Sequence, residues 1–293
     1  MSSTLSGTTI LMSGGSRGIG LAIALRAARD GANVAVLAKT DTPHPTLAGT
    51  VHTAVEQIEA AGGRGLAVVG DVRNDDDVAR AVERTIDRFG GIDVVVNNAS
   101  AIDTRTTTAI DMKRYDLMAD INVRGTFLLS RLSIESLSRS ANPHILTLSP
   151  PLNLTPYWAG KHLAYTMAKY GMSLTTLGLA EELRDRGIGV NSLWPCTLID
   201  TAAIRAMPGG EQLVRAARRP AIMADAAHAV LVRDAATTTG NFFTDEQVLR
   251  EAGVTDFRPY SLGAAEHELL PDIFLSDGSD DPSNDRRRAD SGH

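Results

Sequence analysis

Ser13-Gly14-Gly15-Ser16-Arg17-Gly18-Ile19-Gly20 is the stretch that decides the fold, because it follows a short apolar run, Thr8–Met12, and opens a predicted helix over 18–29. Glycine is needed in such a turn because a side chain would hinder its backbone conformation and keep a pyrophosphate from the helix N-terminus. The spacing is Gly-x-x-x-Gly-x-Gly, which differs from the more common Gly-x-Gly-x-x-Gly. An ordinary tight turn is the alternative, but the position directly after the first strand favours a dinucleotide-binding turn.

Short apolar runs alternate with longer helical patterns from residue 8 to about residue 244. Strands that are apolar throughout are typical of a parallel sheet covered on both faces. We therefore predict an α/β fold, a doubly wound, Rossmann-type parallel sheet of about seven strands with helices on both faces. The predicted strands are Thr8–Met12, Asn33–Ala38, Leu66–Val69, Ile92–Val96, Ile145–Leu148, Gly189–Leu193 and the weaker Asn241–Thr244, and the predicted helices cover 18–29, 47–61, 75–89, 112–139, 162–186 and 224–235.

The alternation predicts a single dinucleotide-binding and catalytic domain over residues 1–253. Residues 197–222 follow the sixth strand and are predicted to form a substrate lid, because ligands of open α/β sheets bind beyond the carboxyl ends of the strands. Residues 254–276 are predicted to form a C-terminal extension. Residues 277–293 are rich in Asp, Ser, Gly, Pro and Arg and are predicted to be a disordered tail.

Composition excludes several classes of protein. Of the 293 residues 43% are hydrophobic, and 35 acidic against 29 basic side chains give a net charge of −6, so we expect no nucleic-acid partner. No apolar run reaches the roughly 18 residues of a membrane span, and Met1–Gly15 lacks the basic start of a signal peptide. The single cysteine, Cys196, favours a reducing compartment, so we expect a cytoplasmic protein, and the scattered histidines indicate no metal site.

The end of the second strand decides which nicotinamide cofactor fits. An acid there accepts a hydrogen bond from the ribose of NAD, whereas a basic residue accommodates the 2′-phosphate of NADP. This chain has Ala38-Lys39-Thr40 and no acid before Asp41, and Arg17 adds a second positive charge from the glycine turn. The sequence therefore favours NADP(H) over NAD(H), the alternative being that both cations are only solvated surface charges.

Residues after the third and fourth strands are predicted to complete the cofactor site. Asp71 and Val72 would offer the adenine a carboxylate and an apolar face. Asn98 and Ala99 end the fourth strand at the same edge, where a strand-terminating turn is the alternative. From the residues alone, the predicted cofactor-binding set is Gly14, Ser16, Arg17, Gly18, Ile19, Gly20, Lys39, Asp71, Val72, Asn98 and Ala99.

Tyr165 and Lys169 begin a long predicted helix, and their four-residue spacing puts them on one face. A free tyrosine has a pKa near 10, and a neighbouring ammonium favours its phenolate. A phenol poised in this way can exchange a proton with a substrate while a hydride moves to or from a nicotinamide. The spacing alone is weak, and an exposed pair is the alternative, but its place after a fifth strand turns the helix start toward the nucleotide.

An ordered set of motifs resembles the short-chain dehydrogenase/reductase family over about residues 5–245, namely Gly14/Gly18/Gly20, Asn97-Asn98-Ala99, Asn122, Tyr165/Lys169 and Pro195. More narrowly, the chain resembles the hydroxysteroid dehydrogenase-like protein 2 group. Eukaryotic members of that group carry a C-terminal sterol-carrier domain and often a peroxisomal address, neither of which we expect here. The segments that carry the narrower likeness are Ala38-Lys39-Thr40 with Pro43-His44-Pro45, Ser149 to Leu154, Ala168 to Ser173, Trp194-Pro195, and Gly253-Val254 through Leu270-Pro271-Asp272.

The resemblance implies a role for each matching residue. Tyr165 would be the proton donor and acceptor, and Lys169 would bind the nicotinamide ribose and lower the tyrosine pKa. Asn122 would hold a proton-relay water, the alternative being a polar residue that bends its helix. Pro195 and Thr197 would line the nicotinamide carboxamide, although Cys196 stands where the family usually has glycine.

The catalytic serine of the family has an uncertain counterpart. It usually ends the fifth strand about thirteen residues before the tyrosine, commonly as the second of two serines. Here the strand ends Leu148-Ser149-Pro150, so strict alignment puts Pro150 at the serine position, and Ser149 precedes Tyr165 by sixteen residues. A short insertion within 150–161 would let Ser149 take the role. We therefore predict that Ser149 reaches the substrate oxygen, with Asn153 and Thr155 as the next donors to consider.

Together these features predict an NADP(H)-dependent oxidoreductase that interconverts an alcohol and its carbonyl. The apolar lid residues Ile204, Met207 and Leu213 indicate a lipophilic small-molecule substrate. The alternatives are an enoyl reductase, or a nucleotide-binding sensor or scaffold with little turnover. Helices 112–139 and 162–186 resemble those through which the family forms dimers and tetramers, so a homodimer or homotetramer is expected.

Overall fold

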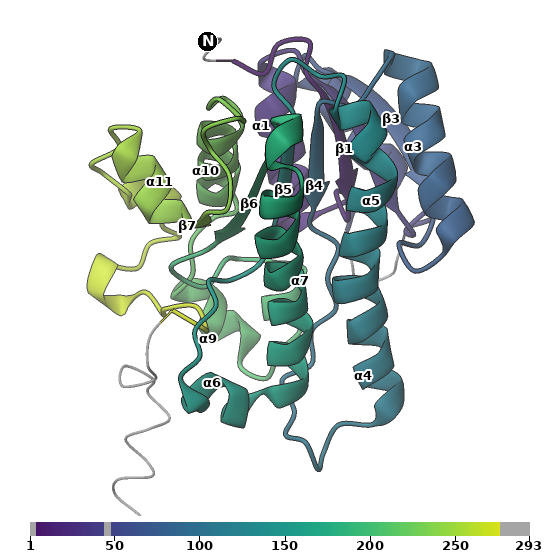
Figure 1. The fold of residues 1–293 in the computed structure, drawn as a ribbon. Coiled ribbons are helices and arrows are strands. Elements are labelled where there is room, and N and C mark those ends of the chain that lie inside the picture. Colours follow the sequence, from purple (N-terminus) through teal and green to yellow (C-terminus); the bar gives the residue numbers. More distant parts are fainter. Residues whose placement is uncertain (1–3, 44–47, 276–293) are drawn as a thin grey trace, which may run out of the picture.

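The computed structural model describes residues 4–43 and 48–275, and the predicted tail 277–293 lies outside this part. Within it, seven strands form one parallel sheet in the order β3-β2-β1-β4-β5-β6-β7. The predicted doubly wound fold with seven strands is therefore confirmed (Figure 1). The strands are β1 (Thr9–Ser13), β2 (Asn33–Ala38), β3 (Arg64–Val69), β4 (Val94–Asn97), β5 (His144–Thr147), β6 (Gly189–Trp194) and β7 (Phe242–Thr244).

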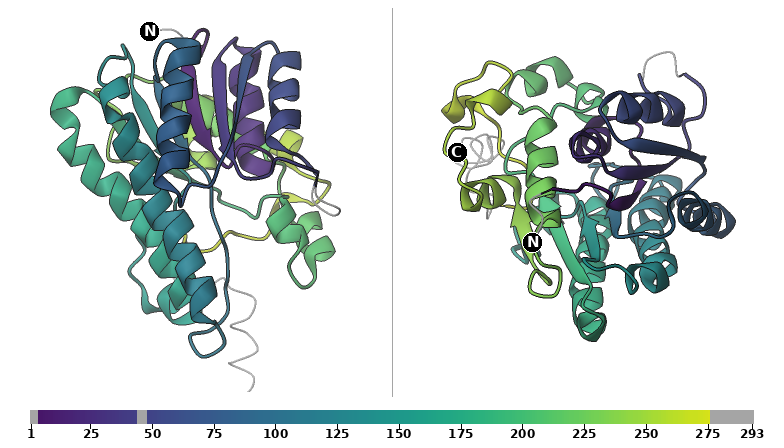
Figure 2. Two further views of the ribbon diagram at one scale, coloured as in Figure 1. Left: turned by 90° about the vertical axis from the view of Figure 1, so that its right-hand side faces the viewer. Right: turned by 90° about the horizontal axis from the view of Figure 1, so that it is seen from above.

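Helices cover both faces of this sheet, as the two further views show (Figure 2). One face carries α1 (Gly18–Arg29), α2 (Val51–Ala60), α10 (Ala221–Leu231) and α11 (Asp245–Glu251). The other carries α3 (Asp75–Phe89), α5 (Gly125–Leu137) and α7 (Leu163–Glu182). The shorter helices are α4 (Met112–Met118), α6 (Pro156–Lys161), α8 (Ala202–Arg205) and α9 (Gly210–Arg215).

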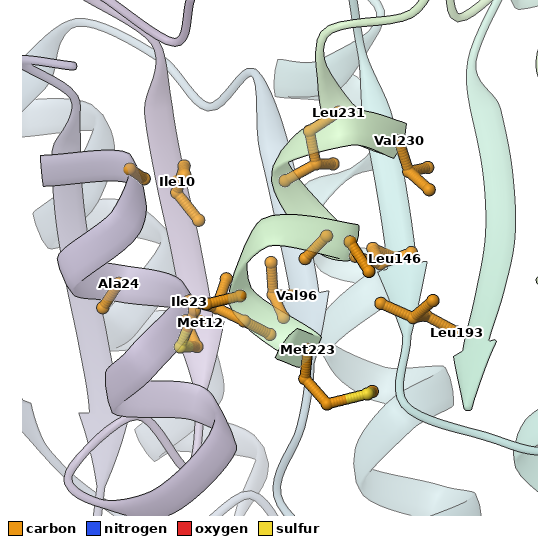
Figure 3. Packing of buried hydrophobic residues seen from close by; sticks show 14 of the residues in the cluster. Ile10, Met12, Ile23, Ala24, Val96, Leu146, Leu193, Met223, Val230 and Leu231 are labelled. Atoms are coloured by element: carbon orange, nitrogen blue, oxygen red, sulfur yellow. The ribbon is translucent and has the colours of Figure 1, made fainter. Parts of the chain in front are cut away.

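Apolar strand residues explain the two layers, because alternate side chains of a strand point to opposite faces. On the face of α1 and α10, Met12 and Leu146 of the sheet pack against Ile23 and Met223 of the helices (Figure 3). On the other face, β-strand residues such as Leu11 join Leu129 of α5 and others in a second core. The two cores fix the carboxyl edge of the sheet, where the glycine turn and the start of α7 lie.

The region predicted as one helix over 112–139 is interrupted. A π-helical turn, Ala119–Arg124, separates α4 from α5 and contains the fully buried Asn122. Such turns commonly occur at functional sites. Residues 112–124 contain no glycine or proline, so the sequence did not indicate this interruption. Across residues 4–43 and 48–275, no helix combines the length and apolar character needed to cross a membrane.

His144 at the start of β5 makes folding stability depend on pH. Its side chain is buried, its Nε2 lies 3.1 Å from the carbonyl oxygen of Arg233, and burial lowers its pKa to about 4. The unfolded chain therefore binds a proton that the folded protein excludes between about pH 4 and pH 6.5. Stability from this group is complete above that window and is lost as the pH falls through it, by about 3 kcal/mol in all.

The test compares His144→Gln with the parent protein in urea unfolding at pH 7 and pH 4. The carboxyl groups titrate in both proteins, so the difference between them isolates the imidazole. The variant should lose less stability on acidification than the parent. Equal losses in the two proteins would contradict the assignment.

Candidate active site

Two adjoining cavities lie at the carboxyl edge of the sheet, the lower end in Figure 1. The first, the nucleotide cavity, lies over the glycine turn and the ends of β2, β3 and β4. The second, the catalytic cavity, has a volume of about 670 Å³ and contains Tyr165 and Lys169. Both cavities are lined by Ile19, Asn98, Ser100, Thr201 and Ala203. A molecule bound in one can therefore reach into the other.

Two glycines of the turn leave no room for a side chain. A Cβ on Gly14, whose φ is 70°, would lie 2.8 Å from the Cα of Ala99, and one on Gly20 would lie 2.5 Å from Nδ2 of Asn98. Asn98 donates to the carbonyl oxygen of Gly14 at 2.8 Å, which ties the turn to the end of β4. Helix α1 begins without a side-chain cap, so its first N–H groups face the nucleotide cavity, as binding of a pyrophosphate requires.

Two cationic side chains, one after β2 and one in the glycine turn, lie at the nucleotide cavity. Lys39 is exposed and Arg17 partly buried, and both line the nucleotide cavity. Arg17 is held in place because its Nη2 donates to the carbonyl oxygen of Gly49 at 2.7 Å. Asp41, the nearest acid in sequence, instead pairs with His52 at 2.7 Å and does not line the cavity.

Asp71 and Val72 also line the nucleotide cavity. The carboxylate of Asp71 accepts from Nη2 of Arg73 at 2.7 Å, and this contact lowers the pKa of Asp71. Asp71 is therefore a fixed negative group at the end of β3. Of the residues predicted to bind cofactor, those that line the nucleotide cavity are Gly14, Ser16, Arg17, Gly18, Ile19, Lys39, Asp71, Val72, Asn98 and Ala99.

Tyr165 and Lys169 meet in the catalytic cavity, both nearly inaccessible to solvent at 5% and 3% exposure. The ammonium of Lys169 donates to the carbonyl oxygen of Leu148 at 2.8 Å and lies 5.1 Å from the centre of the Trp194 ring. Burial lowers the pKa of Lys169 to about 7 and raises the pKa of Tyr165. The lowering of the tyrosine pKa by Lys169 that the resemblance implies does not appear in these shifts, because the loss of solvent dominates at both groups.

Asn122 lies beneath the cavity rather than in its lining. Its Oδ1 accepts from the N–H of Ala101 at 2.8 Å, and its Nδ2 donates to the carbonyl oxygen of Ala101 at 3.0 Å. The side chain thus fastens the π-helical turn to the loop after β4. If Asn122 binds a relay water, as the resemblance implies, its backbone and not its side-chain amide would make that contact.

Ser149, predicted to reach the substrate oxygen, is not among the residues that line the catalytic cavity. The hydroxyl is fully buried and lies 2.8 Å from that of Ser192 in β6, which in turn donates to Thr176 of α7 at 2.9 Å. This chain of hydroxyls joins strand to helix behind the cavity wall. The hydroxyl of Ser149 therefore helps to hold the sheet against α7.

Asn153 and Thr155, the next donors considered, serve the loop itself. Oδ1 of Asn153 accepts from the hydroxyl of Thr155 at 2.8 Å, and Nδ2 of Asn153 donates to the carbonyl oxygen of Phe274 at 3.0 Å. Neither residue lines the catalytic cavity. The longer loop after β5 packs against the C-terminal extension instead of delivering a hydroxyl.

Residues after β6 line the inner end of the catalytic cavity. Pro195 is part of the lining, whereas Thr197, which lines neither cavity, pairs with Pro271 of the C-terminal extension in an antiparallel bridge. The hydroxyl of Thr197 is buried and has no hydrogen-bond partner among the described residues. Such an unsatisfied donor is costly, and a carboxamide oxygen is the kind of group that would satisfy it.

The sequence did not reveal several residues of this cavity. Its lining is mainly apolar and draws on widely separated stretches of chain, including the C-terminal extension, for which the sequence predicted no role in the site. Asp272 is the acidic member of the lining. The residues missed are Ser100, Ile102, Thr104, Leu148, Trp158, His162, Trp194, Met223, Leu270, Pro271, Asp272 and Ile273.

Comparison with known proteins agrees with this architecture. A family model described as short chain dehydrogenase matches residues 8–208. Hydroxysteroid dehydrogenase-like protein 2 of Danio rerio is 52% identical over 94% of this chain and 66% of its own length, and the Homo sapiens protein of that name is 49% identical over 93% and 64%. The solved structure of a short chain dehydrogenase from Mycobacterium thermoresistibile is 50% identical, with a TM-score of 0.87 over 93% of this chain and 96% of that one.

Fold and matches together define the class, that of the nicotinamide-dependent oxidoreductases with a doubly wound sheet. Within this class the chain belongs to the short-chain dehydrogenase/reductase family, whose members act on CH–OH groups with NAD or NADP. The predicted likeness to the hydroxysteroid dehydrogenase-like protein 2 group is confirmed as well. The chain spans about two thirds or less of the length of those curated relatives.

Proposed function

We propose that this protein is an NADP(H)-dependent oxidoreductase that interconverts an alcohol and its carbonyl on a lipophilic small molecule, with Tyr165 as proton donor and acceptor. The observation that carries the proposal is the position of Tyr165. It lies at a mainly apolar cavity of about 670 Å³ that opens directly into the nucleotide cavity. An apolar cavity with a few polar groups suits a lipophilic ligand.

The residues present fit a nicotinamide dinucleotide. The close approach of Gly14 and Gly20 to their neighbours makes a cradle, the uncapped start of α1 offers N–H donors, and Thr197 has a buried hydroxyl without a partner among the described residues. Lys39 and Arg17 would contact a 2′-phosphate. When bound, the nicotinamide would supply or accept the hydride.

In reduction Tyr165 would give its proton to the substrate oxygen. In oxidation the phenolate of Tyr165 would take the proton back. Because burial raises the pKa of Tyr165, the phenol keeps its proton in the ligand-free protein and acts first as an acid. Lys169, fixed through Leu148, would orient the cofactor ribose and, when charged, favour the phenolate after transfer. The apolar lining excludes water from the exchange.

The experiment that tests this proposal follows oxidation of NADPH by the purified protein with panels of lipophilic aldehydes, ketones and enoyl thioesters. Turnover of an aldehyde or ketone supports the proposal. Turnover of enoyl thioesters alone would replace it with an enoyl reductase. Cofactor binding without turnover of any panel member would indicate a nucleotide-binding protein.

Lys39→Asp tests the cofactor choice. The change removes a cation expected to contact the 2′-phosphate. The binding free energy of NADPH should therefore become less favourable by about 1–3 kcal/mol, the usual contribution of a hydrogen bond to a charged group. NADH affinity should not fall, because an acid at this position can accept a hydrogen bond from the ribose of NAD. Titration calorimetry of both cofactors measures the effect, with the exposed Lys113→Asp as the matched control. Equal affinities of the parent protein for NADPH and NADH would contradict the preference.

We also propose that the chain assembles into a homodimer or homotetramer and works in the cytoplasm. Exposed apolar side chains support assembly, because α5 presents Phe127 at 51% exposure and α7 presents Met167, Leu174 and Leu177 at 48–56%. Exposed apolar side chains gathered on neighbouring helices commonly mark an interface. The single, free Cys196 suits a reducing compartment.

A further inference from the structure

The C-terminal extension forms part of the catalytic cavity. Its residues 269–275, here called the strap, run antiparallel to the segment that follows β6. Leu198 donates its N–H to the carbonyl oxygen of Leu270 at 2.9 Å, and Asp272 donates its N–H to that of Cys196 at 3.0 Å. Nε1 of Trp194 donates to the carbonyl oxygen of Ile273 at 3.0 Å. Three hydrogen bonds therefore fix the strap against the wall that carries Pro195.

Phe274 anchors the end of the strap. Its ring is fully buried and stacks on that of Tyr165, with 6.0 Å between ring centres and 30° between planes. Tyr170, Trp194 and Trp158 surround it at 5.4 to 6.0 Å. The strap cannot shift without unpacking the ring of Tyr165, so the residues just before Phe274 hold a fixed position beside that phenol.

Asp272 is the strap residue whose chemistry suits the reaction. It lines the catalytic cavity together with Tyr165 and Lys169. Its Oδ1 accepts from the N–H of Ile273 at 2.7 Å, while its Oδ2 has no hydrogen-bond partner among the described residues. Burial raises the pKa of Asp272 to about 7. This shift favours the protonated carboxyl group, which can donate a hydrogen bond.

Some of the other polar side chains near the cavity are already engaged. The hydroxyl of Ser149 bonds Ser192, and the amide of Asn98 bonds the glycine turn. Thr201, whose hydroxyl accepts from the N–H of Ile204, and Ser100 and Thr104 of the lining also carry hydroxyls, but none of these groups is an acid. A substrate oxygen placed against Tyr165 needs a second polar contact, because charge developing in an apolar site is costly when unpaired.

We propose that Asp272 is a catalytic residue that hydrogen-bonds the reacting oxygen of the substrate, in the place that a serine hydroxyl fills elsewhere in the family. The inference rests on the proposed alcohol–carbonyl interconversion. In reduction, the hydride joins the carbonyl carbon and the proton of Tyr165 joins the oxygen. The Asp272 carboxyl donates a hydrogen bond to that oxygen throughout and keeps its own proton, so no further proton or electron enters the balance.

The test compares Asp272→Leu, which keeps the size but removes the donor, with Asp272→Asn, which keeps a donor. The leucine variant should lose about a hundredfold in kcat, the usual effect of removing one preorganised donor. The asparagine variant should stay within about tenfold of the parent, because an amide still donates, though without the acid's strength. NADPH affinity and thermal unfolding should not change in either variant. Asp256→Asn, on the exposed surface of the same extension, is the matched control.

Three outcomes would overturn the inference. They are full activity in Asp272→Leu, equal losses of kcat in the leucine and asparagine variants, and a hundredfold loss in Ser149→Ala with none in Asp272→Leu. Failure of the proposed function is distinguishable from these, because the parent protein itself would then turn over no aldehyde or ketone.

Discussion

Tyr165→Phe should lower turnover by roughly 10²–10⁴, the range that general acid–base groups contribute, while NADPH affinity stays almost unchanged. The change keeps the ring that stacks on Phe274 and removes only the acidic hydroxyl. Because the phenol is buried in an apolar cavity, bulk water cannot replace it as proton donor. Steady-state oxidation of NADPH with the best carbonyl substrate measures the loss.

The matched control is Tyr115→Phe, which removes a phenol hydroxyl from α4, outside both cavities. It should keep the activity and the stability of the parent. Near-normal turnover in Tyr165→Phe would end the proposed mechanism. Loss of folding in both variants would instead indicate that these phenol hydroxyls stabilise the fold.

Arg218→Ala should lower the free energy of unfolding by about 3–5 kcal/mol, because it removes one partner of a buried ion-pair network. Arg218 is fully buried, pairs with Glu246 and Glu266, and lies 5.3 Å from the centre of the Phe257 ring. Glu266 and Phe257 belong to the C-terminal extension. The guanidinium thus ties that extension to the body of the protein, and without it Glu246 would be a partly buried charge with one partner fewer.

Urea unfolding measures the effect, and Glu266→Gln is the matched control. The side chain of Glu266 is 58% exposed, so water can compensate for its loss and the change should cost less than about 1 kcal/mol. The alanine variant should also lose activity at temperatures where it is still folded, since the extension carries the strap. A cost below 1 kcal/mol for Arg218→Ala would show that the network is not a tether.

The fold was predictable because its signals are local. Continuous apolar runs mark buried strands, and the bounds of β2 at Asn33–Ala38 agree with the prediction to the residue. The predicted start of β3 came two residues late, because this edge strand begins with the exposed Arg64 and with Gly65, which carry no apolar signal. An edge strand needs no continuous apolar run, so its polar end looked like a loop.

The site was predictable where a motif fixes the backbone, and not where distant segments meet. The glycine turn and the Tyr165–Lys169 pair follow from spacing within one turn or one helix. The direction of Ser149 depends on hydroxyl partners on β6 and α7, which no local pattern reveals. Asp272 lies more than a hundred residues from Tyr165 in the sequence, in a stretch without periodicity, and only the pairing of the strap with residues 196–198 brings the two together.

Transfer of deuterium from NADPH labelled at C4 of the nicotinamide, read by mass spectrometry of the product alcohol, tests the central claim most directly. The label reports hydride transfer itself and not merely loss of cofactor. We predict deuterium on the former carbonyl carbon with the parent protein, and almost none in the same time with Tyr165→Phe. Label on that carbon at equal rates in the two proteins, or NADPH bound tightly with no label transferred to any aldehyde or ketone, would contradict the account.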